Sequence, residues 1–409
     1  MFAFLKNAYH YFLAFVGNII YWFPSRKIFV IGITGTKGKS TTLELTNAIF
    51  EAAGRKTALV SSLRFKIGDK SVKNMTGMTM PGRFFLQKKL RKAVDAGCKY
   101  FLVEVTSQGV LQHRHQFINW DAALVTNVQP EHIEAHGSFA KYRESKENFF
   151  RYVAKKSRKA NKFFFVNDDD PSKSYFVNAA SNAGKIIYFS REKFINEEMD
   201  MGKKSIGDWL QSNFNLENAA AAAVIAESQG IAWPLIQRTL QSFKGVPGRM
   251  DYVQEKPFAV VIDYAHTPDS LEKVYQTLLT RTSNKKLICV LGAAGGGRDR
   301  WKRPVLGRVA EKYCKKIVLT DEDPFDEDPM GILDQIESGF SKHQNKNYFR
   351  ILDRREAIGK AILLARKGDT VIITGKGTED WIRGAKNKKI PWNERKTVEE
   401  LLAKCNHRD

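Results

Sequence analysis

The sequence predicts an α/β protein built from two domains in series. Apolar, β-branched runs alternate with amphipathic stretches, as they do in βαβ units. The runs are almost continuously apolar, which favours parallel sheets covered on both faces. Two glycines and a proline at 245–248 mark a linker between two such series. We therefore expect an apolar segment at 1–27, a first domain at 28–247 and a second at 248–409.

Each domain is expected to hold its own series of strands. Helical stretches such as 41–53 and 84–96 separate the strands of the first series. The strands expected in the first domain are 28–33, 57–61, 100–105, 122–126, 163–166 and 186–189. Those expected in the second are 259–263, 286–291, 316–320, 348–352 and 370–374.

The net charge of the chain bears on its binding partners, and its cysteine content bears on its cellular compartment. The chain has 66 Lys+Arg against 44 Asp+Glu, a formal net charge of +22, which attracts polyanions. No nucleic-acid-binding motif accompanies this charge, so we expect no nucleic-acid partner, and solvated basic faces remain an alternative. The four cysteines show no C-x-x-C spacing, which suits the reducing cytoplasm.

The N-terminal segment 7–23 is apolar and aromatic. His10, Gly17 and Asn18 interrupt it, and it is short for a membrane span. Its Tyr and Trp residues, followed by Arg26 and Lys27, would suit a helix lying peripherally on the inner face of a membrane. A helix packed on the protein's own body explains the same pattern, and the sequence leaves both open.

A glycine-rich turn at 32–41 joins the first predicted strand to a helix. Gly35 and Gly38 allow backbone N–H groups to converge on phosphate oxygens. Lys39 can reach the terminal phosphates of a nucleotide, and the Ser40 hydroxyl can bind Mg²⁺. The glycine spacing is one residue longer than in the strict G-x-x-x-x-G-K pattern. The position between a buried strand and a helix nevertheless predicts an ATP-binding loop.

The loop sequence Thr-Gly-Thr-Lys-Gly-Lys-Ser-Thr resembles that of the Mur ligases, and more motifs follow in that family's order. The run 104–114 is similar to the stretch after the central strand in the MurE branch. Further matches are Thr126-Asn127, Glu131-His132, His136-Gly137, Lys146, 167–170, Phe214-Asn215, Asn218, Gly248-Arg249-Met250, 263–269, Lys302-Arg303-Pro304, Asp323-Pro324 and 375–379. The resemblance covers roughly 28–400.

The resemblance implies a central P-loop ATPase domain with a mostly parallel sheet, and a C-terminal Rossmann-like α/β domain that binds an amino acid. It implies an ATP-dependent ligase that converts a carboxylate into an acyl phosphate and adds an amino acid to a muramoyl-peptide. Such an enzyme serves peptidoglycan synthesis, and through it cell-wall biogenesis, cell shape and cell division. ATP and two Mg²⁺ ions are the implied cofactors.

The resemblance also assigns roles to individual residues. The implied catalytic residues are Lys39, Glu104, His132 and Lys146. The implied metal ligands are Ser40, Glu104, His132 and Lys146, the last after carbamylation by CO₂. From the residues alone, Glu104 could be a strand-end acid, His132 a structural histidine and Lys146 a solvated lysine.

Binding residues follow from the same matches. Nucleotide contacts are implied for Gly35, Thr36, Lys37, Gly38, Lys39, Ser40, Thr41, Asn127, Asn218, Arg249, Asp263 and His266. Substrate contacts are expected at Thr76, Thr79, Thr106, Gln112, Arg114, Asp323, Phe325, Gly375 and Glu379. Arg114 is the natural partner for a carboxylate or phosphate of the acceptor.

The sequence departs from the family pattern at two places. The family's N-terminal UDP-binding domain is missing, so the acceptor could be lipid-linked or otherwise altered. Phe325 stands where diaminopimelate-adding members carry an arginine, and six acids lie at 321–328 around it. An acidic pocket there would favour lysine or ornithine, whereas a solvated acidic loop would favour neither.

Two other functions compete with this one. A folylpolyglutamate-synthase-like or cyanophycin-synthetase-like ligase would share the loop, but 104–114 and 263–269 favour the Mur branch. A non-catalytic subunit that docks on a membrane or partner through 1–23 is the alternative from a different class. The presence of Lys39, Glu104, His132 and Lys146 disfavours it.

Overall fold

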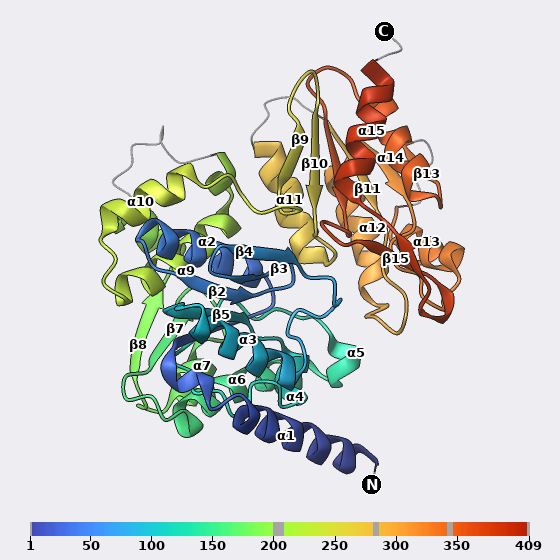
Figure 1. Ribbon diagram of the computed structural model, residues 1–409. Helices are drawn as coiled ribbons and strands as arrows, with labels where there is room; N and C mark the ends of the chain where they lie inside the picture. Colours follow the sequence, from blue (N-terminus) through green and yellow to red (C-terminus); the bar gives the residue numbers. More distant parts are fainter. Residues whose placement is uncertain (1, 199–207, 281–285, 342–346, 407–409) are drawn as a thin grey trace. The chain divides into compact units, whose positions relative to one another are not determined.

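The computed structural model describes residues 2–198, 208–280, 286–341 and 347–406. The chain divides into two compact units, Met1–Lys244 and Gly245–Asp409. Each unit contains a mostly parallel sheet with helices on both faces (Figure 1). The predicted α/β fold class is therefore confirmed.

The sheet of the first unit has the strand order β4-β3-β2-β5-β1-β6-β7-β8. The neighbouring strands in the part of the sheet ordered β2-β5-β1-β6-β7-β8 are all parallel. Strands β3 and β4 add an antiparallel hairpin at the β2 edge. The strands are β1 (Phe29–Thr34), β2 (Thr57–Val60), β3 (Arg64–Ile67), β4 (Lys70–Lys73), β5 (Tyr100–Glu104), β6 (Ala122–Val125), β7 (Phe163–Asn167) and β8 (Lys185–Phe189).

Helices cover both faces of this sheet because its strands are apolar on both sides. Val30 belongs to one buried cluster, with residues of α3 and α6, while Ile31 and Ile33 belong to another, with residues of α2 and α9. The helices are α1 (Phe2–Ile20), α2 (Lys39–Ala52), α3 (Arg83–Asp95), α4 (Ser107–Leu111), α5 (Ile133–His136), α6 (Phe139–Lys156), α7 (Lys173–Ala180), α8 (Arg191–Lys193), α9 (Asn213–Ser228) and α10 (Trp233–Ser242), with short turns η1 (Pro24–Lys27), η2 (Phe194–Glu198) and η3 (Asp208–Gln211).

The second unit has the strand order β13-β12-β11-β14-β10-β9, with β9 antiparallel to β10 and a separate β15–β16 hairpin. Its strands are β9 (Asp251–Gln254), β10 (Ala259–Asp263), β11 (Leu287–Leu291), β12 (Lys316–Leu319), β13 (Tyr348–Arg350), β14 (Thr370–Thr374), β15 (Trp381–Arg383) and β16 (Lys389–Pro391). Its helices are α11 (Pro268–Thr280), α12 (Lys302–Tyr313), α13 (Pro329–Glu337), α14 (Arg354–Leu364) and α15 (Glu394–Asn406), with the turn η4 (Ala385–Asn387).

The topology of the first sheet positions a site. The central strand β1 lies between β5 and β6, and the chain runs from it toward both edges. Ligands bind in open α/β sheets at the carboxyl ends of strands where the order reverses. Thr34, Glu104 and Val125 end β1, β5 and β6, so the loops that follow meet at this edge.

Candidate active site

The glycine-rich loop connects β1 to α2 with a backbone that only glycine tolerates. Gly35 has φ +139° and Gly38 has φ +83°. A Cβ added at Gly35 would lie 1.9 Å from Thr126 Oγ1, and one at Gly38 would lie 2.1 Å from Asn218 Oδ1. Gly38 is also the N-cap of α2, so the positive end of the helix faces the loop. The loop therefore has the shape and polarity of an anion cradle.

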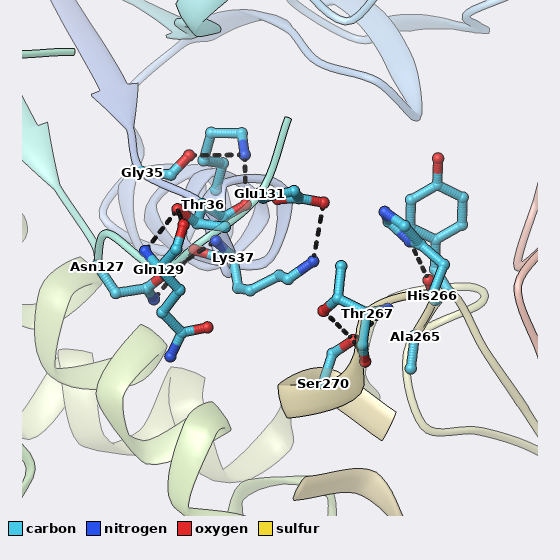
Figure 2. A network of polar contacts seen from close by, with 12 residues as sticks. Gly35, Thr36, Lys37, Asn127, Gln129, Glu131, Ala265, His266, Thr267 and Ser270 are labelled. Carbon is cyan, nitrogen blue, oxygen red and sulfur yellow. Dashed lines mark hydrogen bonds and ion pairs between the residues drawn. The ribbon is translucent and has the colours of Figure 1, made fainter. Parts of the chain in front are cut away.

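Side chains from the loop after β6 hold the cradle in place (Figure 2). The Lys37 backbone N–H donates to Asn127 Oδ1 at 3.0 Å, and Lys37 Nζ pairs with Glu131 at 3.1 Å. The Gln129 backbone N–H donates to Thr36 Oγ1 at 3.0 Å. The predicted nucleotide residue Asn127 thus lies against the loop, as does Asn218, which accepts a hydrogen bond from Thr42 at 3.3 Å.

Two lysines converge on the same carbonyl of the loop. Lys39 Nζ donates to Gly35 O at 2.9 Å and to Thr36 O at 2.8 Å, while Lys146 Nζ donates to Gly35 O at 2.8 Å. Lys146 comes from α6 and is 2% exposed. Burial, and next the positive charge of Lys39, hold the pKa of Lys146 well below its usual value. Lys146 is therefore not a solvated surface lysine.

Ser40 and Glu104 meet at a third residue that the sequence did not single out. Ser62 lies in the turn after β2; its hydroxyl is 3.0 Å from Ser40 Oγ, and its backbone N–H donates to Glu104 Oε1 at 3.1 Å. Glu104 is 1% exposed at the end of β5. A hydroxyl and a carboxylate are hard oxygen ligands, which suit Mg²⁺ together with phosphate oxygens and water. No motif marks Ser62, because a serine in a turn is common.

His132 lies on the other side of the loop, near Lys146. It begins α5 in a left-handed conformation, with φ +55°. Its ring is 6.0 Å from that of Tyr142, whose ring also faces Lys146 Nζ at 4.5 Å. Tyr142, which the sequence did not single out, further bonds Thr36 Oγ1 at 3.1 Å. Lys39 and Lys146 therefore contact the loop directly, while Glu104 and His132 are linked to it through Ser62 and Tyr142.

The described residues hold no preformed cluster of metal-binding side chains. Among the described residues, no group of three or more His, Cys, Asp or Glu side chains could hold a metal ion. A Mg²⁺ site built from Ser40 and Glu104 does not require such a group of side chains, because Mg²⁺ keeps several waters and binds substrate phosphates. The residues present therefore fit Mg²⁺ that arrives with a nucleotide.

The predicted acceptor residues cluster around α4 and the turn before α3. Thr106 caps α4 by accepting from the Gly109 N–H at 3.0 Å, and Thr76 Oγ1 donates to Asn74 Oδ1 at 2.6 Å. Arg114 donates to Met80 O and, at 2.7 Å, to Gln112 Oε1. Its buried Nε has no partner, and burial lowers its pKa. Thr79 is half-buried in the turn.

The predicted residues at the start of the second unit form a cluster of their own. Asp263 accepts from the N–H groups of Met250 and Ala265, both at 2.7 Å, so it shapes the end of β10. The Arg249 guanidinium lies 4.3 Å from the ring centroid of Tyr264. His266 Nδ1 is 2.8 Å from Tyr264 O, next to the Thr267–Ser270 turn that begins α11 (Figure 2).

The predicted amino-acid residues surround a buried lysine. Lys376 pairs with Asp323 at 2.8 Å and with Glu379 at 2.6 Å, and Tyr264 OH donates to Glu379 at 3.0 Å. A Cβ on Gly375 would lie 2.4 Å from Glu322 Oε2, so the glycine leaves room for that carboxylate.

Three of the acids around Phe325 already have internal partners. Asp323 pairs with Lys376, Glu327 pairs with Arg303 at 2.9 Å, and Asp328 caps α13. Asp321 differs, because burial raises its pKa to about 6. The expected acidic pocket is therefore partly neutralised from within by Lys376 and Arg303.

These features define an α/β ATPase with a phosphate-binding loop and a second α/β unit. Comparison with known proteins specifies the family. The model of the Mur ligase middle domain matches residues 33–226, and that of the Mur ligase, glutamate ligase domain matches 248–377. The chain therefore belongs to the Mur ligase family, which confirms the resemblance, and it is an ATP-dependent ligase.

Individual relatives agree. The chain is 36% identical over 405 residues to the UDP-N-acetylmuramoyl-L-alanyl-D-glutamate–2,6-diaminopimelate ligase of Syntrophomonas wolfei, covering 95% of this chain and 81% of the relative. A solved structure of a ligase of that name is 26% identical, with a TM-score of 0.59 and coverage of 93% and 79%. Mycobacterium tuberculosis folylpolyglutamate synthase shares the fold, with a TM-score of 0.71 at 16% identity over 89% of this chain and 91% of the synthase.

Proposed function

We propose that this ligase adds an amino acid to a muramoyl-peptide acceptor by way of an acyl phosphate. The observation that carries the proposal is that Lys39 and Lys146 contact one phosphate loop, to which Ser62 links Glu104 and Tyr142 links His132. Phosphorylating a carboxylate brings several negative charges together, and this loop supplies cations, backbone N–H groups and metal ligands to offset them.

The steps assign a task to each group. An oxygen of the acceptor carboxylate attacks the γ-phosphorus of ATP, and ADP leaves; Lys39 is placed to offset the charge on the transferred group. The amine then attacks the acyl carbon and loses a proton, and phosphate leaves with the attacking oxygen. Mg²⁺ held by Ser40 and Glu104 would supply further charge neutralisation. Arg114 would hold a carboxylate or phosphate of the acceptor through its guanidinium.

We propose that Lys146 is carbamylated by CO₂ and then helps to bind a second Mg²⁺ with His132. The reaction requires an uncharged amine, and burial beside Lys39 favours that form. Protein incubated with ¹³C-bicarbonate should show a carbamate carbon signal that Lys146→Met removes. The same signal in both proteins would contradict the assignment.

We propose lysine or ornithine as the incoming amino acid. Phe325 stands where the resemblance places an arginine for diaminopimelate, and an aromatic ring cannot pair with a carboxylate. Since two of the acids nearby are paired with cations of the protein, the proposal rests mainly on Phe325. Diaminopimelate is the competing candidate, because Arg298 lies 5.9 Å from the Phe325 ring centroid and could meet its distal carboxylate.

Phosphate release by the purified protein tests the function. We expect release only with ATP, Mg²⁺, a muramoyl-dipeptide acceptor and an amino acid together, fastest with lysine or ornithine. A faster reaction with diaminopimelate would overturn the choice of amino acid. No release with any amino acid would overturn the ligase assignment to this acceptor.

We further propose that the enzyme works in the cytoplasm, in peripheral contact with the inner face of the membrane through residues 1–23. The four cysteines are free thiols, as in reducing compartments, and α1 exposes aromatic side chains. Centrifugation of cell extracts tests the contact. Equal recovery of full-length protein and protein lacking 1–23 in the soluble fraction would contradict it.

A further inference from the structure

Helix α1 turns an apolar face outward, which is the reverse of an ordinary surface helix. Ala14, Gly17 and Asn18 are buried and face the body of the first unit. The exposed large side chains on and just after the helix are Tyr9, Tyr11, Phe12, Phe15, Ile19, Ile20 and Trp22. Phe12 is 60% exposed and Trp22 77%, and no charged residue lies between 7 and 24. Exposed apolar patches of this kind mark contact surfaces.

The helix is tied to the part of the chain that holds the predicted acceptor residues. The Tyr11 ring packs edge-on against Phe117 with centroids 4.8 Å apart, and Phe15 packs against Phe117 at 5.3 Å. Tyr11 also contacts the His113 ring at 5.9 Å. His113 lies next to Arg114 in sequence. Whatever fixes the position of α1 therefore also fixes the acceptor loop, 112–117.

Positive charge borders the apolar face. The first 43 residues contain no Asp or Glu. Helix α3 packs against α1 and carries Lys88, Lys89, Arg91 and Lys92. Arg26 and Lys27 follow α1 and are exposed.

We propose that α1 lies flat on an anionic lipid surface and holds the acceptor loop there, so that the acceptor is a muramoyl-peptide carried on a membrane lipid. Tyr and Trp side chains favour the interface between lipid and water, and nearby cations attract anionic headgroups. No helix within the described residues is long and apolar enough to cross a membrane. The docking half of the proposal is independent of the ligase function, whereas the acceptor half rests on it.

Vesicle flotation with the full-length protein and no substrate tests the docking half. The test variant is the double substitution Phe12→Gln and Ile19→Gln. The matched control is Leu363→Gln and Tyr188→Gln, at exposed apolar positions elsewhere. We expect wild type and control to bind phosphatidylglycerol-containing vesicles more tightly than pure phosphatidylcholine vesicles. The test variant should bind at least about tenfold more weakly, because two apolar side chains no longer enter the lipid.

Three results would overturn docking. They are wild-type protein that stays unbound, equal binding by wild type and test variant, and a wild-type dimer in light scattering that the test variant loses. The last would assign the face to a second copy of the chain. Equal melting temperatures of the variants would show that the fold is intact.

The acceptor half is tested by activity. We expect a higher kcat/KM for a muramoyl-dipeptide on polyprenyl diphosphate in vesicles than for the soluble UDP form, and the test variant should lose that preference. A preference for the soluble form would overturn this half. Reaction of neither form would overturn the proposed function and leave the flotation result standing.

Discussion

At the scale of single residues, the phosphate loop depends on glycines for which no other residue can substitute. The sequence predicted Gly35 and Gly38 because both precede a lysine and a serine at the start of a helix. The sequence could not show which atoms enclose them. Thr126 and Asn218 are distant from the loop in the sequence, and only the fold brings them into contact with Gly35 and Gly38.

Gly38→Ala should weaken ATP binding by at least about tenfold. Its φ of +83° disfavours a side chain, and the new Cβ would displace Asn218 Oδ1. Gly82→Ala is the matched control, since nothing lies within 4 Å of its Cβ and its φ is negative. Calorimetric titration with ATP measures both, and unchanged affinity in Gly38→Ala would refute the role of the loop.

His115 should make the first unit sensitive to acid. Burial lowers its pKa from 6.5 to about 3, with His113 adding to the effect. Between these values the unfolded chain binds a proton that the folded protein excludes. The contribution of His115 to the free energy of unfolding is therefore fully present above pH 6.5. It is lost as the pH falls toward 3, by about 1.4 kcal/mol per pH unit.

Urea unfolding of wild type and His115→Gln at pH 7.5, 6, 5 and 4 measures this contribution of His115 to the free energy of unfolding. The stability of wild type relative to the variant should decline below pH 6.5. Parallel pH curves for the two proteins would show that His115 does not titrate on unfolding.

At the scale of elements, apolar patterning predicted the parallel strands and missed the polar ones. The buried runs that became β1, β5, β6, β10, β11 and β14 lie close to their expected bounds. The β3–β4 hairpin was not predicted, since β4 reads Lys-Ser-Val-Lys and is exposed along its whole length. The short β9, β15 and β16 were missed for a similar reason, because a strand of three or four partly exposed residues is too short to show a recognisable hydrophobic pattern.

Helices α14 and α15 are joined by a buried and an exposed ion pair, which makes a matched comparison. The side chains of Arg354 and Glu394 are fully buried. Arg354 also donates to Thr374 O, and Glu394 also accepts from Trp392 Nε1. Glu394→Gln should destabilise the second unit by about 3–5 kcal/mol, because it leaves a buried guanidinium without its counter-charge.

The exposed pair Arg355–Glu400 joins the same helices. Glu400→Gln should cost less than about 1 kcal/mol, because water screens that pair. Denaturant midpoints of the two variants give the comparison, and equal losses would refute the role of burial.

At the scale of the whole molecule, the two units have separate sets of predicted residues. The first holds the phosphate loop and the residues predicted to bind metal and acceptor, and the second holds the residues around Lys376. Ordered motifs revealed this division from sequence. Pairing within the acidic loop could not be predicted, because Lys376 and Arg303 are distant from it in the chain.

Isotope transfer from the acceptor tests the central claim, carboxylate activation by ATP, most directly. The acceptor is labelled with ¹⁸O in its reacting carboxylate and incubated with enzyme, ATP, Mg²⁺ and lysine. An acyl phosphate requires that one ¹⁸O appear in each released phosphate, as read by mass spectrometry, with ADP as the nucleotide product. Lys39→Ala should abolish that transfer. Phosphate released without ¹⁸O, or label found in AMP, would contradict the account.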